Sequence, residues 1–135
     1  MDERYQVSKL LEVLFVRALA EKIQSGPHAQ EPLILNCLNP GFCHSGLSRN
    51  STGIAGLIFV LMKLLLARTT EVGSRTLVAG ALAGEESMGK YMSNCGVIEP
   101  SPFVRSDEGK ETGERVYTEL IEILEKIQPG ISKVI

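Results

Sequence analysis

Tyr5 and Lys9, in the stretch RYQVSKLLEVLF at residues 4–15, have residue types and a spacing that suit proton transfer. On a helix, residues four apart share a face, and their side chains can approach each other. A lysine ammonium beside a phenol favours the phenolate, which would lower the tyrosine pKa from about 10 toward a working pH. Such a tyrosine can exchange a proton with a carbonyl or alcohol oxygen. The alternative is a surface lysine beside a partly buried tyrosine, because the spacing alone is common.

A second group of candidate residues follows a short apolar run at 33–38, which leads into an Asn-Pro-Gly turn at 39–41. The run predicts a strand that is buried on both faces, as in a parallel sheet. The loop FCHSGLSRN at 42–50 would then lie at the carboxyl end of this strand, where open α/β sheets bind ligands. We therefore expect this loop to share one rim of the sheet with Tyr5 and Lys9.

The elements that must position these groups alternate between helices and short strands. Apolar periodicity and turn residues predict the order α–β–α–α–β–α, with helices at 2–24, 53–67, 70–83 and 111–128 and strands at 33–38 and 90–93. The stretch EPSPFVRSDEGKETG at 99–113 is expected to be a loop. Two buried strands with helices on both faces do not make a self-sufficient sheet. Residues 1–135 are therefore predicted to form a single partial domain of a larger α/β protein.

Composition argues against several classes of protein. Charged residues make up 22% of the chain and the formal net charge is -2, without a dense Lys/Arg cluster, so we expect no nucleic-acid partner. The first residues, MDERYQ, lack the apolar core of a signal peptide, and the three cysteines lack CxxC spacing, which indicates reduced thiols in the cytoplasm. Cys43 and His44 have no third ligand at a recognised spacing, so no metal site is expected.

The most apolar run, GIAGLIFVLMKLLLA at 53–67, is too short to cross a bilayer, which takes about 20 residues, and it contains Lys63. Its length and periodicity predict a helix that is buried in the core or in an interface. A helix at a membrane surface is the alternative.

Four stretches of the chain resemble the short-chain dehydrogenase/reductase family. YQVSK at 5–9 is similar to the family's Y-x-x-S-K active-site helix, and LNPGFCHSGL at 38–47 is similar to its strand that ends before a nicotinamide-contacting loop. GKYMSNCGVIEPSP at 89–102 and LIEILEKIQPGI at 120–131 resemble the distal strand and C-terminal helix of fungal retinol-dehydrogenase-like members. The resemblance covers essentially the whole chain, but only the C-terminal part of a family domain about twice as long. It implies the C-terminal half of a Rossmann-like, doubly wound parallel sheet, with the N-terminal cofactor half absent.

The resemblance also implies an activity, that of an NAD- or NADP-dependent oxidoreductase acting on a small carbonyl or alcohol substrate. Tyr5 would be the general acid/base of hydride transfer. Lys9 would lower the Tyr5 pKa and hydrogen-bond the nicotinamide ribose, so both residues would contact the cofactor. Pro40, Gly41 and Phe42 would lie against the nicotinamide.

Two further implications concern the segment after this turn. Ser45 stands where the family often has threonine, and its hydroxyl would hold the carboxamide or a phosphate oxygen. The apolar segment 47–67 would lie over the substrate, which implies an apolar or bulky substrate.

Other family features are absent from this sequence. The Gly-rich turn that binds the pyrophosphate is not found, and neither the family's catalytic serine nor its asparagine precedes Tyr5. We therefore expect the chain to be inactive by itself, as the product of a truncation, a partial gene model or a deliberate excision. The alternative is a non-enzymatic remnant or interaction protein that associates through its apolar helices. Exposed strand edges and apolar patches favour such association, and the family's Tyr/Lys helix often lies in a homodimer interface.

Overall fold

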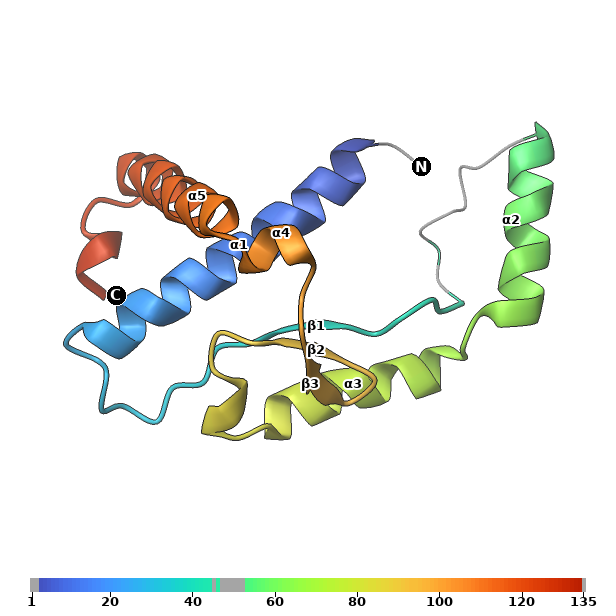
Figure 1. The fold of residues 1–135 in the computed structure, drawn as a ribbon, viewed down its shortest axis with the longest axis horizontal. Coiled ribbons are helices and arrows are strands. Elements are labelled where there is room, and N and C mark those ends of the chain that lie inside the picture. The colour runs from blue at the N-terminus through green and yellow to red at the C-terminus, as the bar shows by residue number, and fades with distance from the viewer. Residues whose placement is uncertain (1–2, 45, 47–52, 135) are drawn as a thin grey trace.

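The computed structural model describes residues 3–44, 46 and 53–134. Figure 1 shows helices on two sides of a small sheet, with α2 standing apart at one side of the molecule. The elements in chain order are α1 (Glu3–Ser25), β1 (Cys37–Asn39), α2 (Gly53–Leu66), α3 (Thr70–Leu82), η2 (Glu85–Ser87), β2 (Tyr91–Ser93), β3 (Gly96–Ile98), α4 (Pro102–Arg105), α5 (Asp107–Ile127) and η3 (Ile131–Val134). The predicted mixed α/β class is confirmed, and α1, α2 and α3 begin and end within a residue or two of the predicted bounds.

The described strands form one sheet in the order β1-β2-β3. β1 and β2 are parallel, with Cys37 opposite Tyr91 and Asn39 opposite Ser93. The connection between them runs through α2 and α3, as expected for a parallel pair, which needs a crossover. The carboxyl ends of β1 and β2 therefore lie at the same edge, next to the turn that follows Asn39.

The third strand, β3, was not expected, so the predicted two-strand order is wrong in this respect. β3 pairs antiparallel with β2 and places Ser93 opposite Gly96. The two residues between the strands, Asn94 and Cys95, both have positive φ, at 52° and 63°. A two-residue hairpin turn with positive φ at both positions matches the twist of the flanking strands, and asparagine accepts this conformation readily.

The segment 33–38 differs from its prediction in length and in burial. Only Cys37–Asn39 forms a strand, and Leu33 is 52% exposed. Among the described residues, β1 pairs with β2 alone, so one edge of β1 has no neighbouring strand. An apolar run is buried on both faces only where elements cover both faces, and the described elements do not do so at Leu33 and Ile34.

The segment 99–113 was expected to be a loop, and this prediction is wrong. It contains α4 and the first two turns of α5, which begins after Ser106. The Ser106 side chain accepts a hydrogen bond from the Gly109 amide at 3.1 Å and so caps the helix. Gly109 and Gly113, which favoured a loop, are helical residues at which α5 approaches α4 and α1 closely.

The largest buried contact joins α1 to α5. Leu14 and Ala18 of α1 are buried, as is Val104 of α4. The Lys22 ammonium of α1 and the Glu114 carboxylate of α5 form an ion pair at 2.8 Å. α1 is therefore held on one side of the sheet, with Tyr5 and Lys9 in its first turns.

α2 is mostly exposed within the described part of the chain, so it is not the predicted core helix, and its predicted place in an interface stays a prediction. Its apolar side chains are exposed over most of its circumference, with Ile54 at 81% and Leu65 at 79%, whereas the face that carries Phe59 and Lys63 is partly covered. Phe59 makes an edge-to-face contact with Phe42, whose ring lies 5.6 Å away between centroids. None of the described helices is long and apolar enough to cross a membrane.

Candidate active-site cleft

A cleft of about 640 Å³ lies between α1, the end of β1 and the segment that follows β3. Tyr5 and Lys9 line it from α1, and Asn39 and Pro40 line it from the carboxyl end of β1. Tyr91 of β2 contributes a second phenol. The structure thus brings the predicted Tyr/Lys pair and the predicted strand end to one cleft, although the two lie far apart in the sequence.

Tyr5 and Lys9 share a face of α1, as the helical spacing predicts. The Lys9 ammonium lies 5.8 Å from the centre of the Tyr5 ring. Its hydrogen bonds go to both carboxylate oxygens of Glu12, at 2.8 and 3.0 Å. The hydrogen bond to Glu12 raises the pKa of Lys9, with a smaller contribution from its charge, so Lys9 is an ammonium at neutral pH.

Glu12 is a member of the cleft that the sequence reasoning missed. It lines the cleft and holds the Lys9 side chain three residues away along the helix. The spacing of Lys9 and Glu12 could have revealed this contact, because residues i and i+3 on a helix are neighbours.

The turn after β1 has the geometry that its residues predict. The Gly41 amide donates a hydrogen bond to the Asn39 side-chain oxygen at 2.8 Å, and Gly41 has φ of 81°, a conformation that favours glycine. Of the three residues expected beside the nicotinamide, Pro40 lines the cleft, whereas Gly41 and Phe42 are not among its lining residues. The Phe42 ring packs against Phe59 of α2 instead.

Ser45, the fourth loop residue predicted to contact a cofactor, lies outside the described residues. Its role stays a prediction. The same holds for residues 47–52 of the segment expected over the substrate, while the described part of that segment is the exposed helix α2.

Cys37 is a further cleft residue that the sequence reasoning did not single out. It lies on β1 opposite Tyr91 and is one of the residues that line the cleft. Burial raises the pKa of the Cys37 thiol, so the group is uncharged at neutral pH. The pairing of Cys37 with Tyr91 depends on strand register, which no local pattern in the sequence specifies.

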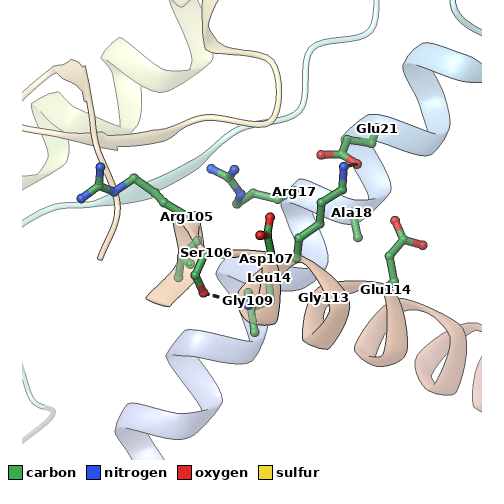
Figure 2. A pocket seen from close by; sticks show the side chains of 12 residues that line it. Leu14, Arg17, Ala18, Glu21, Arg105, Ser106, Asp107, Gly109, Gly113 and Glu114 are labelled. Atoms are coloured by element: carbon green, nitrogen blue, oxygen red, sulfur yellow. Dashed lines mark hydrogen bonds and ion pairs between the residues drawn. The ribbon is translucent and has the colours of Figure 1, made fainter. Parts of the chain in front are cut away.

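A second, much smaller hollow of about 90 Å³ lies where α1 meets α5. Figure 2 shows Leu14 and Ala18 of α1 beside Gly109 and Gly113 of α5, with charged side chains at the rim. Its size and its packed lining mark it as a gap between two helices. Among the described residues, no three His, Cys, Asp or Glu side chains come together to hold a metal ion.

Comparison with curated proteins finds fungal relatives along nearly the whole chain. The chain is 52% identical over 131 residues to the short chain dehydrogenase/reductase dmxR8 of a Cryptosporiopsis species, covering 97% of this chain and 39% of the relative. It is 48% identical over 134 residues to the short-chain dehydrogenase anuD of Penicillium roqueforti, covering 97% of this chain and 35% of the relative. The short chain dehydrogenase FGM9 of Gibberella zeae is 36% identical over 132 residues.

The chain spans well under half of the length of these relatives, between 35% and 39%. No family model matches the chain. No solved structure matches it either.

Proposed function

The chain belongs to the short-chain dehydrogenase/reductase family of these fungal relatives, and we propose that it carries the acid/base side of an NAD(P)-dependent oxidoreductase site. The proposed reaction is hydride transfer between nicotinamide and a carbonyl or alcohol carbon. The observation that carries the proposal is the convergence of Tyr5, Lys9, Asn39 and Pro40 on one cleft at the carboxyl end of β1. In open α/β sheets this is the place where ligands bind.

The residues of the cleft fit a nicotinamide cofactor. The volume of the cleft, about 640 Å³, lies within the range of small-molecule sites, and the cleft combines apolar walls with a few polar groups. The Lys9 ammonium and the Asn39 amide supply charge and hydrogen bonds for a ribose or a carboxamide, and Pro40 supplies a flat apolar surface. The bound cofactor would supply or accept the hydride.

Tyr5 would move the proton that accompanies the hydride. In the reducing direction its hydroxyl would donate a proton to the carbonyl oxygen while the carbonyl carbon receives the hydride, which gives an alcohol and a phenolate. The Lys9 ammonium would stabilise this phenolate by its charge. In the oxidising direction the phenolate would take the proton back. Gly41, Phe42 and Ser45 remain proposed cofactor contacts through the loop after β1.

We also propose that the chain is one part of a Rossmann-like, doubly wound domain. Among the described strands, β1 has a neighbour on one edge alone, which supports this because a parallel sheet is ordinarily covered and continued on both sides. The exposed apolar side chains of Leu33, Ile34 and α2 support it too, since an isolated domain rarely leaves such surface uncovered. A chain of this kind would bind nicotinamide nucleotides weakly, if at all, when studied alone.

The test is a chimera in which this chain replaces the matched segment of the Cryptosporiopsis dehydrogenase/reductase. We expect nicotinamide-dependent turnover of the host's substrate, followed by cofactor absorbance. Tyr5→Phe should lower kcat about 10²- to 10⁴-fold, the usual contribution of a general acid/base. Tyr117→Phe is the matched control, because Tyr117 also lies 5.8 Å from a lysine ammonium, that of Lys22, but on α5. Equal activity of the two variants would refute the assignment of Tyr5.

A second candidate function is association with other polypeptides through apolar helices, without catalysis. The exposure of most of the apolar surface of α2 favours it. The two candidates separate in one pair of measurements, which are turnover by the chimera and the oligomeric state of the chain alone. An inactive chimera together with a chain that self-associates would favour the association function.

A further inference from the structure

Arg68 lies in the short segment between α2 and α3 and forms hydrogen bonds with the loop that follows β1. The Arg68 amide donates a hydrogen bond to the Phe42 carbonyl at 2.8 Å, and the His44 amide donates one to the Arg68 carbonyl at 3.0 Å. These two bonds form a short parallel bridge between Arg68 and Cys43. The backbone of the loop is therefore held by the residue that immediately precedes the cap of α3.

The Arg68 side chain extends the attachment in two directions. One guanidinium nitrogen, Nη1, donates to the Asn94 side-chain oxygen at 2.6 Å. The same nitrogen would lie 3.3 Å from a Cβ atom placed on Gly41, so the guanidinium covers the Gly41 backbone. One residue thus connects the Pro-Gly turn after β1 with the turn that joins β2 to β3.

The cysteine of the loop fixes its other side. The Cys43 thiol donates to the Pro40 carbonyl at 3.4 Å, and a Cβ atom on Gly73 of α3 would overlap the Cys43 sulfur. Close packing on α3 and the guanidinium of Arg68 therefore hold the turn from opposite ends. Without such contacts a loop of this kind would be among the more mobile parts of a domain.

We propose that Arg68 is a positioning residue, which holds the Pro40–Gly41 turn at the carboxyl ends of β1 and β2 so that a nicotinamide ring would meet a fixed surface beside Tyr5. The inference rests on the proposed oxidoreductase function. An arginine suits the role because its planar fork carries five donors and can serve two partners at once, which the single ammonium of a lysine does less well. Arg68 itself touches no reacting atom.

The first experiment measures amide hydrogen exchange in the chain as it exists. Arg68→Met should speed exchange at the Gly41 and His44 amides about three- to tenfold, the factor expected when one typical solvent-exposed hydrogen bond is lost. Arg68→Lys should lie between Arg68→Met and the unmodified chain. Arg75→Met is the matched control, because Arg75 is an exposed arginine of α3 whose ion pair with Glu71 lies at 2.9 Å.

A second variant tests the Arg68–Asn94 contact by changing Asn94, which accepts the hydrogen bond. Asn94→Gly removes the acceptor of the Arg68 hydrogen bond and still allows the positive φ of this position. We expect the same two amides to exchange faster, and the double variant with Arg68→Met to show no further increase. Unchanged exchange at Gly41 and His44 in both single variants would overturn the proposal, as would faster exchange spread evenly over α1 and α5.

The third experiment uses the chimera and separates positioning from folding. Arg68→Met should raise the KM for the nicotinamide cofactor about fivefold and leave the KM for the carbonyl substrate unchanged. A fall in kcat with both KM values unchanged would indicate fewer folded molecules and would overturn the positioning role. If the chimera with the unmodified chain shows no turnover, the oxidoreductase proposal fails, and the exchange data still decide whether Arg68 anchors the turn.

Discussion

Two glycines of α5, Gly109 and Gly113, should respond differently to replacement by alanine: the first change should destabilise the chain and the second should not. A Cβ atom on Gly109 would overlap the Phe103 carbonyl oxygen and lie 3.1 Å from Val104 Cα. Both neighbours are backbone atoms of α4, which cannot rotate away as a side chain can. A Cβ atom on Gly113 would meet the Leu14 carbonyl oxygen at 3.4 Å, close to ordinary van der Waals contact.

The expected magnitudes follow from these contacts. Either change removes a helical glycine and so gains about 1 kcal/mol of helix propensity. At Gly109 the overlap costs about 1–3 kcal/mol, as in other overpacked sites, and displacement of the Gly109 amide from Ser106 costs about 1 kcal/mol more. Gly109→Ala should therefore lower the free energy of unfolding by about 1–3 kcal/mol. Gly113→Ala should leave it unchanged or raise it by up to about 1 kcal/mol.

Urea denaturation followed by far-UV circular dichroism measures both values, because the unfolding free energy is extrapolated from the same transition in each variant. Each glycine serves as the control for the other, since both lie on α5 one helical turn apart (Figure 2), but Gly109 faces the backbone of α4 whereas Gly113 faces α1. Equal stability of the Gly109→Ala variant and the unmodified chain would refute the packing argument. A loss of more than about 1 kcal/mol in Gly113→Ala would refute the propensity argument.

Three further predictions concern pH, thiol reactivity and association. Hydrogen bonds from the Ser132 hydroxyl and from two backbone amides lower the pKa of Glu125. Its stabilisation of the C-terminal turn is therefore present above its unfolded pKa and lost as pH falls through the folded pKa. The protection factors of the η3 amides, which correct for the slower intrinsic exchange at low pH, should fall at acid pH, and Glu125→Gln should abolish this dependence. The half-buried thiol of Cys37, whose pKa is raised by burial, should react with a thiol reagent more slowly than the exposed thiol of Cys95. The labelling rates are measured in a variant that lacks Cys43, and faster labelling of Cys37 would contradict the described cleft. Leu65→Lys on α2 should leave the unfolding midpoint unchanged, because this side chain is 79% exposed. The same variant should show less self-association in sedimentation velocity, since it places a charge in an exposed apolar surface. An unchanged oligomeric state would argue against α2 as the contact surface.

Much of the helical structure could be predicted from the sequence because its signals are local. Gly26 and Pro27 end the first helix, and Thr69 caps α3 by accepting a hydrogen bond from the Val72 amide. The four-residue spacing of Tyr5 and Lys9 placed the two side chains on one face before any tertiary contact was known. Such features depend on residues within a turn or two of each other, so neighbouring sequence suffices to determine them.

The tertiary structure decided the features that join distant parts of the chain. The register that sets Cys37 opposite Tyr91, and the hairpin that adds β3, depend on which strands meet. The contact of Arg68 with Asn94 joins two turns that are separated by the whole of α3.

Gly109 and Leu33 show that tertiary packing can override the local preference of a single residue. By local propensity Gly109 favours a loop, yet it lies in a helix, where its missing Cβ lets α5 approach the Phe103 backbone closely. Leu33 is an apolar residue that a buried strand would accommodate, yet it is exposed because no described element covers it. The sequence by itself therefore determined the first three helices and the Tyr5–Lys9 face. The cleft that gathers Tyr5, Lys9 and Pro40 exists only because the packing of α1 on the sheet brings separate segments together.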